Sequence, residues 1–90
     1  MIIAHFDPKN MNATTYAEVL RQLEVAGQGS PKGRVHHVSY GDTGALRVID
    51  TWDTPQNMEA FGKVLLPILG SLGIEMDPPH VTTVHNIIRG

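Results

Sequence analysis

The chain has 90 residues, of which 41% are hydrophobic and 18% are charged, which suits one folded core and excludes an intrinsically disordered chain. Seven Lys and Arg against nine Asp and Glu give a formal charge of −2, and without a basic cluster no nucleic-acid partner is expected. No cysteine is present, so disulfides are excluded.

The first two expected elements are a strand and an amphipathic helix. Met1–Phe6 is an apolar run ended by Asp7–Pro8, and its apolar residues occupy both alternating sets, as in a central strand. Thr15 and Glu18 stand at capping-box spacing before a helix that Gly27 ends. The apolar positions of this helix follow the i, i+3, i+4, i+7 pattern and are Tyr16, Val19, Leu20 and Leu23.

The middle of the chain predicts a hairpin. Gly27–Gly33 is a loop by composition. The β-prone runs Arg34–Tyr40 and Ala45–Trp52 flank Gly41–Gly44, a connector of residues that tolerate turn geometry. The two runs are therefore expected to pair as antiparallel neighbours.

A second helix and a last strand complete the predicted order. Thr54 is an N-cap followed by Pro55 at the first helical position, and Pro67 is expected to kink the helix. Glycines and Pro78–Pro79 end it, after which Val81–Ile88 reads as a strand. The buried stripe of the helix is Met58, Phe61, Leu65, Ile68 and Leu72.

This order predicts one α+β domain over residues 1–90 with a ferredoxin-like βαββαβ fold, a four-stranded antiparallel sheet with two helices on one face. Adjacent aliphatic residues on a strand point to opposite faces, and three expected strands carry such pairs: Ile2–Ile3, Val48–Ile49 and Ile87–Ile88. The face without helices therefore needs a cover, and a second copy of the sheet supplies one. We expect a homodimer; the alternative is that strand ends tolerate exposed aliphatics.

No membrane association is expected. The N-terminal residues lack the basic region and the apolar stretch of roughly 7 to 15 residues of a secretory signal. The densest apolar run, Val64–Leu69, is far shorter than the roughly 18 residues of a membrane span. A cytoplasmic location is the prediction.

The five histidines do not predict a metal site. His36 and His37 are neighbours on an expected strand, so they point to opposite faces. Neither a helical H-x-x-x-H nor a C-x-x-C motif is present. His80 is expected in a solvated loop. His5 on the central strand could look into the barrel between subunits, but a hydrogen-bonded core histidine is the commoner case.

The hairpin register groups the candidate acid/base residues. Closure with Tyr40 opposite Ala45 places alternate residues on the helix-covered face, namely Val35, His37, Leu46, Val48, Asp50 and Trp52. A buried carboxylate needs a donor, and Asp50 could find it in His37, Tyr16 or the Trp52 indole. A carboxylate beside an imidazole can act as an acid/base unit. The alternative is a solvated Asp50 and a purely structural Trp52, and a one-residue slip would disperse the group.

His85 lies on the expected last strand and is a further titratable candidate for this face. The alternative is a hydrogen-bonded histidine on an edge strand at the subunit boundary.

The runs Leu46–Thr54 and Leu66–Leu69, with Phe61, Gly73 and the closing Val84–Asn86, resemble small uncharacterised bacterial proteins of the dimeric α+β barrel superfamily, which includes antibiotic-biosynthesis monooxygenases. The similarity covers 34–88 by pattern and the whole chain by element order. It implies a homodimer with facing sheets and one pocket per subunit between sheet and helices.

Enzymes of that superfamily include oxygenases of aromatic polyketides that use no metal or flavin, haem-degrading oxygenases, and small isomerases or lyases. Haem degraders share an Asn, Trp and His set, which this sequence matches only at Trp52. The resemblance thus raises the expectation of small-molecule chemistry without selecting a reaction.

The leading hypothesis is a cofactor-free enzyme, monooxygenase-like or isomerase/lyase-like, that acts on a small aromatic or carbonyl compound and holds no metal. The catalytic candidates are Asp50, His37 and His85, and the substrate-binding candidates are Trp52, Tyr16 and Phe61. The alternative is a non-catalytic module that binds a small ligand on the same dimeric barrel, and a purely structural role is the third possibility.

Overall fold

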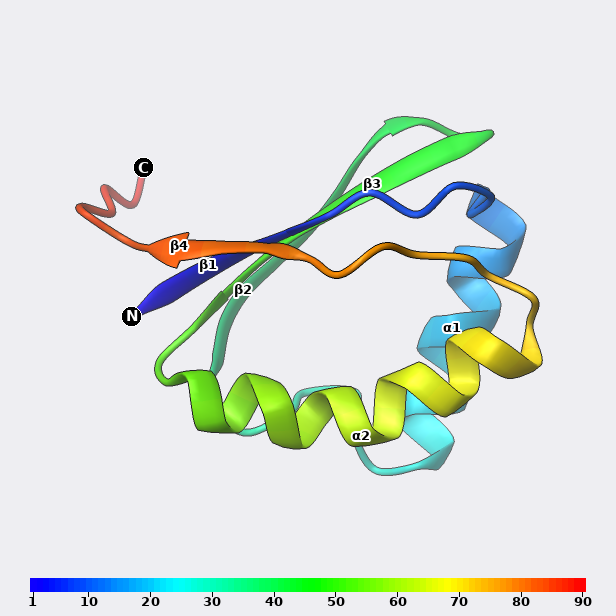
Figure 1. The fold of residues 1–90 in the computed structure, drawn as a ribbon, viewed down its shortest axis with the longest axis horizontal. Helices are drawn as coiled ribbons and strands as arrows, with labels where there is room; N and C mark the ends of the chain where they lie inside the picture. The colour runs from blue at the N-terminus through cyan, green and yellow to red at the C-terminus, as the bar shows by residue number, and fades with distance from the viewer.

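The four strands form one antiparallel sheet with both helices on the same side (Figure 1). The computed structural model describes residues 1–90, and the strand order is β2-β3-β1-β4. The elements in chain order are β1 (Ile2–Phe6), α1 (Ala13–Val25), β2 (Arg34–Asp42), β3 (Ala45–Trp52), α2 (Pro55–Ser71) and β4 (His80–Thr83). The predicted ferredoxin-like βαββαβ fold is confirmed.

Helix α1 begins earlier than its predicted capping box. Asn12 is the N-cap: its side chain accepts from the Thr15 N–H, and its own N–H donates to the Thr15 hydroxyl, both at 2.9 Å. The predicted Thr15 and Glu18 box is therefore wrong, because Glu18 instead accepts hydrogen bonds from Arg21. Gly27, at φ 75°, follows the helix end as predicted.

The hairpin is tighter than predicted and its register differs by two residues. Asp42 pairs with Ala45, so the turn is Thr43–Gly44, and Tyr40 lies opposite Arg47. Side chains alternate with a period of two, so a shift of two residues leaves each side chain on its expected face.

A β-bulge interrupts β2 between Arg34 and His36. Arg34 pairs with Trp52 and His36 with Thr51, which leaves Val35 as the extra residue. Paired residues point to the same face, so the bulge turns Arg34 to the helix-covered side. The sequence predicted Val35 there, and that prediction is wrong because strict alternation fails at a bulge.

Helix α2 starts as predicted, with the Thr54 hydroxyl accepting from the Asn57 N–H at 3.2 Å and Pro55 at the first helical position. It runs through Pro67 to Ser71. Its Phe61 and Leu69 join the core that fills the space between helices and sheet. That core consists of Ala4, Phe6, Met11, Val19, Leu23, Leu46, Val48, Trp52, Phe61, Leu69 and Ile74.

Strand β4 is shorter than predicted. It ends at Thr83, and the Val84 N–H bond to the Met1 carbonyl at 3.0 Å is the last backbone contact of the tail with the sheet. The predicted strand over Val81–Ile88 is therefore wrong beyond Thr83, and Ile87–Ile88 does not belong to the sheet. His80 opens this strand instead of lying in a loop.

The opposite face of the sheet has no helix (Figure 1). By register it carries Ile3 and His5 from β1, Ile49 from β3, and Val38 and Tyr40 from β2. Val38 is 51% exposed, and the Tyr40 hydroxyl lies 2.6 Å from His5 Nε2. We call this surface the open face. No helix of the protein has the length and apolar character needed to cross a membrane.

Candidate active site

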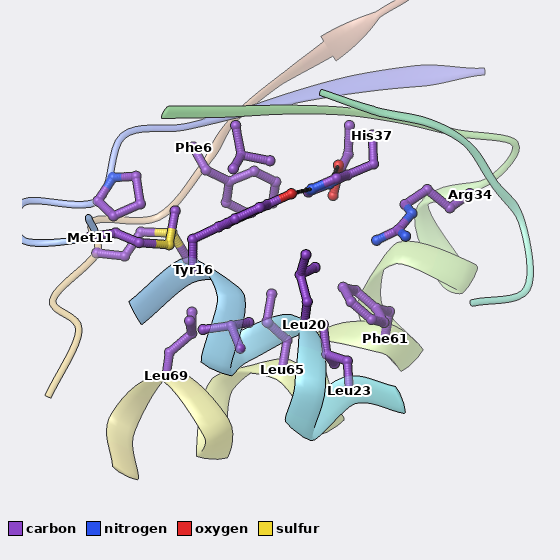
Figure 2. A pocket seen from close by; sticks show the side chains of 15 residues that line it. Phe6, Met11, Tyr16, Leu20, Leu23, Arg34, His37, Phe61, Leu65 and Leu69 are labelled. Atoms are coloured by element: carbon purple, nitrogen blue, oxygen red, sulfur yellow. Dashed lines mark hydrogen bonds and ion pairs between the residues drawn. The ribbon is translucent and has the colours of Figure 1, made fainter. Parts of the chain in front are cut away.

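An apolar pocket lies between the sheet and the two helices (Figure 2). Eleven of its 15 lining residues are hydrophobic, Tyr16 of α1 among them, and the other four are Pro8, Arg34 and His37 of β2, and Asp50 of β3. Its volume is about 50 Å³, whereas a cavity that accepts benzene measures about 150 Å³. Leu20, which is 37% exposed, projects into the pocket from α1, so a ring-sized ligand must displace a side chain such as this one.

Asp50 is the buried carboxylate of the site. It is 3% exposed, and its Oδ1 lies 2.6 Å from His37 Nδ1. The contact follows from the fold, because His37 and Asp50 are directly paired across the β2–β3 ladder and so point to the same face. The predicted grouping of these two residues is found in the structure.

Tyr16 extends the pair into a chain of three. Its ring comes from α1 and stacks on His37 at an interplanar angle of 3°, and its hydroxyl lies 2.7 Å from His37 Nε2. A carboxylate only accepts hydrogen bonds, so His37 donates to Asp50 from Nδ1, and in the neutral imidazole Nε2 then accepts from the Tyr16 hydroxyl. Figure 2 shows the Tyr16 side chain reaching from α1 to His37 on the sheet, with their interaction drawn as a dashed line.

At the pocket, the hydrogen-bonded series Asp50–His37–Tyr16 ends in a phenol and not in an imidazole. Both His37 nitrogens are occupied, one by Asp50 and one by Tyr16. The Tyr16 oxygen keeps a free lone pair, and Tyr16 is one of the residues that line the pocket. The arrangement can move a proton between the pocket and His37 while Asp50 stabilises the imidazolium.

Arg34 is the lining residue with a fixed positive charge. Its guanidinium lies 5.6 Å from the centroid of the Phe61 ring, and its Nη2 donates to the Gly29 carbonyl at 3.3 Å. It forms no ion pair; the ion-paired arginines of the protein are Arg21 and Arg47. Sequence reasoning missed Arg34 because only the bulge turns it into the pocket.

Of the remaining predicted site residues, some line the pocket and others do not. Phe61 lines the pocket together with Tyr16. Trp52 is fully buried behind Phe61, with ring centroids 5.4 Å apart, and does not line it. His85 is exposed in the tail after β4, and the structure does not bring it to Asp50. No group of three His, Asp or Glu side chains lies close enough to hold a metal ion.

Comparisons with known proteins bear on the fold. No protein-family model matches the chain, and no curated protein matches its sequence. A structure from Deinococcus radiodurans, described as a putative antibiotic biosynthesis monooxygenase, superposes with a TM-score of 0.66 at 16% identity, covering 99% of this chain and 97% of that one. A second so described, from Chloroflexus aurantiacus J-10-fl, gives 0.64 at 17% identity, covering 98% and 94%. The chain thus has the fold of antibiotic-biosynthesis-monooxygenase-like proteins over nearly its whole length.

Proposed function

We propose that this chain, built on the fold of those monooxygenase-like structures, is a small cofactor-free enzyme that acts on a small aromatic or carbonyl compound between sheet and helices. The observation that carries the proposal is the hydrogen-bonded chain from Asp50 through His37 to Tyr16, which ends at the wall of an apolar pocket. Its chemistry is proton removal from a carbon next to a carbonyl, the step shared by isomerase-like and monooxygenase-like reactions.

The proton path follows the chain. Tyr16 passes its hydroxyl proton to His37 Nε2, and the phenolate oxygen then accepts the proton of the substrate carbon, leaving an enolate. Asp50 fixes the His37 tautomer and stabilises the imidazolium, the role of the carboxylate in a hydrolase triad. Where a double bond is conjugated with the enolate, Tyr16 returns a proton to the far carbon of that double bond and His37 returns its proton to Tyr16, which completes an isomerisation. Attack of the enolate on O2 leads instead to oxygenation, in which a CH2 group becomes a carbonyl and the second oxygen atom leaves as water.

The test uses phenylpyruvate, a small aromatic carbonyl compound with acidic benzylic protons. NMR follows deuterium incorporation at its CH2 group in 2H2O. The wild-type chain is expected to accelerate this exchange above the buffer rate, and Tyr16→Phe and Asp50→Asn to lose about 100-fold or more of the acceleration.

Tyr40→Phe is the matched control, because Tyr40 forms the other Tyr–His pair of the protein on the open face. It should exchange phenylpyruvate at the wild-type rate. A wild-type rate equal to that of buffer, or a Tyr16→Phe rate equal to wild type, would reject the proposal.

The second candidate function is a binding module that holds a small ligand without turnover. The same apolar pocket supports it, because ligand sites are mostly apolar with a few placed polar groups. Affinity for phenylpyruvate separates the two. An Asp50→Asn variant that binds normally but does not exchange supports the enzyme, whereas wild-type binding without exchange supports the module.

We also propose that two copies pair through their open faces. Val38 is half exposed there, and both its ladder partner Ile49 and Ile3 on β1 are only partly buried. Pairing would bury these aliphatic side chains and complete a second layer on the sheet. The cytoplasmic location stays a prediction from the sequence.

A further inference from the structure

We infer that Arg34 makes the pocket selective for an anionic ligand, an aromatic carboxylate whose ring enters the apolar part while its carboxylate binds the guanidinium. This inference rests on the proposed function for its choice of pocket, and it names the class of substrate.

The first support is the unpaired state of the Arg34 charge. The ion pairs of the protein join Lys9 to Asp77, Arg21 to Glu18, His37 to Asp50 and Arg47 to Asp7. The Arg34 guanidinium has one hydrogen bond, the long one to the Gly29 carbonyl, which leaves most of its five N–H donors free. A guanidinium with free donors is suited to two parallel hydrogen bonds with a carboxylate.

The second support is the place of Arg34 in the pocket. Figure 2 shows its guanidinium beside Phe61 and directed toward the cavity, at the end away from Met11. Arg34 and His37 also line an adjoining polar groove of about 220 Å³. Arg34 therefore stands where apolar lining gives way to polar surface, which matches a ligand with an apolar body and a charged end.

The third support is that the backbone holds Arg34 in place. Gly33, at φ 87°, precedes it, and the Gly33 carbonyl accepts from the Asp53 N–H at 2.8 Å. The bulge after Arg34 sets its face, and the Phe61 ring supports the guanidinium. The nearby Asp50 carboxylate is bonded to His37, which leaves Arg34 as the lining group available to an anion.

The test compares two probes of nearly identical shape, trans-cinnamate and trans-cinnamamide, which differ in the charge of one end. Isothermal titration calorimetry should give the wild-type chain about tenfold higher affinity for cinnamate, the effect expected of charge-assisted hydrogen bonds at a partly exposed site. Arg34→Gln should bring the two affinities within twofold of each other and leave that for cinnamamide unchanged.

Two further variants keep the result decisive. Arg34→Lys retains the charge without the planar fork and should keep part of the preference for cinnamate. Arg47→Gln removes an exposed arginine that is paired with Asp7 and should keep all of it.

The inference would be overturned if the wild-type chain bound cinnamate and cinnamamide with equal affinity or did not bind cinnamate. It would also be overturned if Arg34→Gln and Arg34→Lys both kept the full preference for cinnamate. These outcomes are distinct from failure of the enzyme proposal. Absent phenylpyruvate exchange would reject turnover and leave the cinnamate preference standing, whereas equal probe affinities would reject anion selectivity and leave the exchange standing.

Discussion

His37 is the residue on which the candidate site depends, because it contacts both other members of the chain. It contacts Asp50 across the β2–β3 hairpin and Tyr16 on α1. Removing it therefore separates the buried carboxylate from its hydrogen-bond donor and the phenol from its acceptor.

We predict that His37→Leu destabilises the protein by about 3 kcal/mol, because a buried carboxylate that loses its partner costs about 3–5 kcal/mol. The double variant His37→Leu/Asp50→Leu should recover most of this loss, since apolar replacement of both partners is nearly neutral. Urea unfolding, monitored through the fluorescence of Trp52, measures the free energy of unfolding of both variants. A double variant no more stable than the single one would show that Asp50 does not depend on His37.

Glu18 on α1 gives a prediction about pH. Hydrogen bonds from Arg21, and then from Gln22, lower the pKa of the Glu18 carboxyl from 4.5 to about 2. A lowered pKa means that the stabilising contact is present above pH 4.5 and is lost as the pH falls through about 2. Arg21→Met should raise the Glu18 pKa toward its ordinary value, as measured by NMR titration.

The control for this titration is Lys9→Met, which removes a cation paired with Asp77 and not with Glu18. It should leave the Glu18 pKa unchanged. An equally low Glu18 pKa in Arg21→Met would contradict the assigned cause.

At the scale of elements, the segment from Gly33 into β2 positions the pocket cation. Gly33 has a positive φ, and a side chain there would collide with Asp53 and Asn57 at the start of α2. The backbone of this segment thus approaches α2 closely only because the residue is glycine.

We predict that Gly33→Ala destabilises the protein by about 2 kcal/mol or more, from the strained φ and the collision together. Gly44→Ala is the matched control in the hairpin turn, because a Cβ there meets nothing and its φ is not positive. Thermal unfolding of the two variants measures the difference. Equal melting temperatures would show that the segment can move away from α2 at little cost.

The predictable elements are those with strong local signals. The Thr54–Pro55 signal predicts the start of α2 correctly. Period-two alternation places His37 and Asp50 on one face even though the predicted hairpin register differs from the observed one by two residues. The bulge at Val35 has no such signal, because it depends on pairing with β3. For this reason the sequence predicts the contact between His37 and Asp50 but not the place of Arg34 in the pocket.

The prediction for the C-terminal strand was wrong for a related reason. Val81–Ile88 reads as one strand from its sequence, but β4 pairs only with β1, and β1 begins at Ile2. The ladder therefore has no partner for residues beyond Thr83. His85 was placed with Asp50 on the assumption of a longer strand.

At the scale of the molecule, the uncovered side of the sheet determines the expected assembly. We predict that the wild-type chain has twice the 9.8 kDa chain mass by light scattering at micromolar concentration. Val38→Glu, which places a charge among the aliphatic side chains of the open face, should give a folded monomer.

Val25→Glu is the control, because Val25 is 78% exposed at the end of α1, away from the open face. It should keep the mass of the wild type. A wild-type mass of one chain, or a dimeric Val38→Glu variant, would refute pairing through the open face.

The two Tyr–His pairs lie back to back across one sheet: Tyr16 with His37 under the helices, and Tyr40 with His5 on the open face. Their strand partners, Asp50 for His37 and Ile49 for His5, are consecutive residues of β3. The NMR signals of an imidazole depend on the hydrogen bonds that it makes, and these two imidazoles bond to different tyrosines. The protein therefore contains two internal reporters, so that one spectrum can test the proposed ligand binding at His37 and the proposed pairing of two copies at His5.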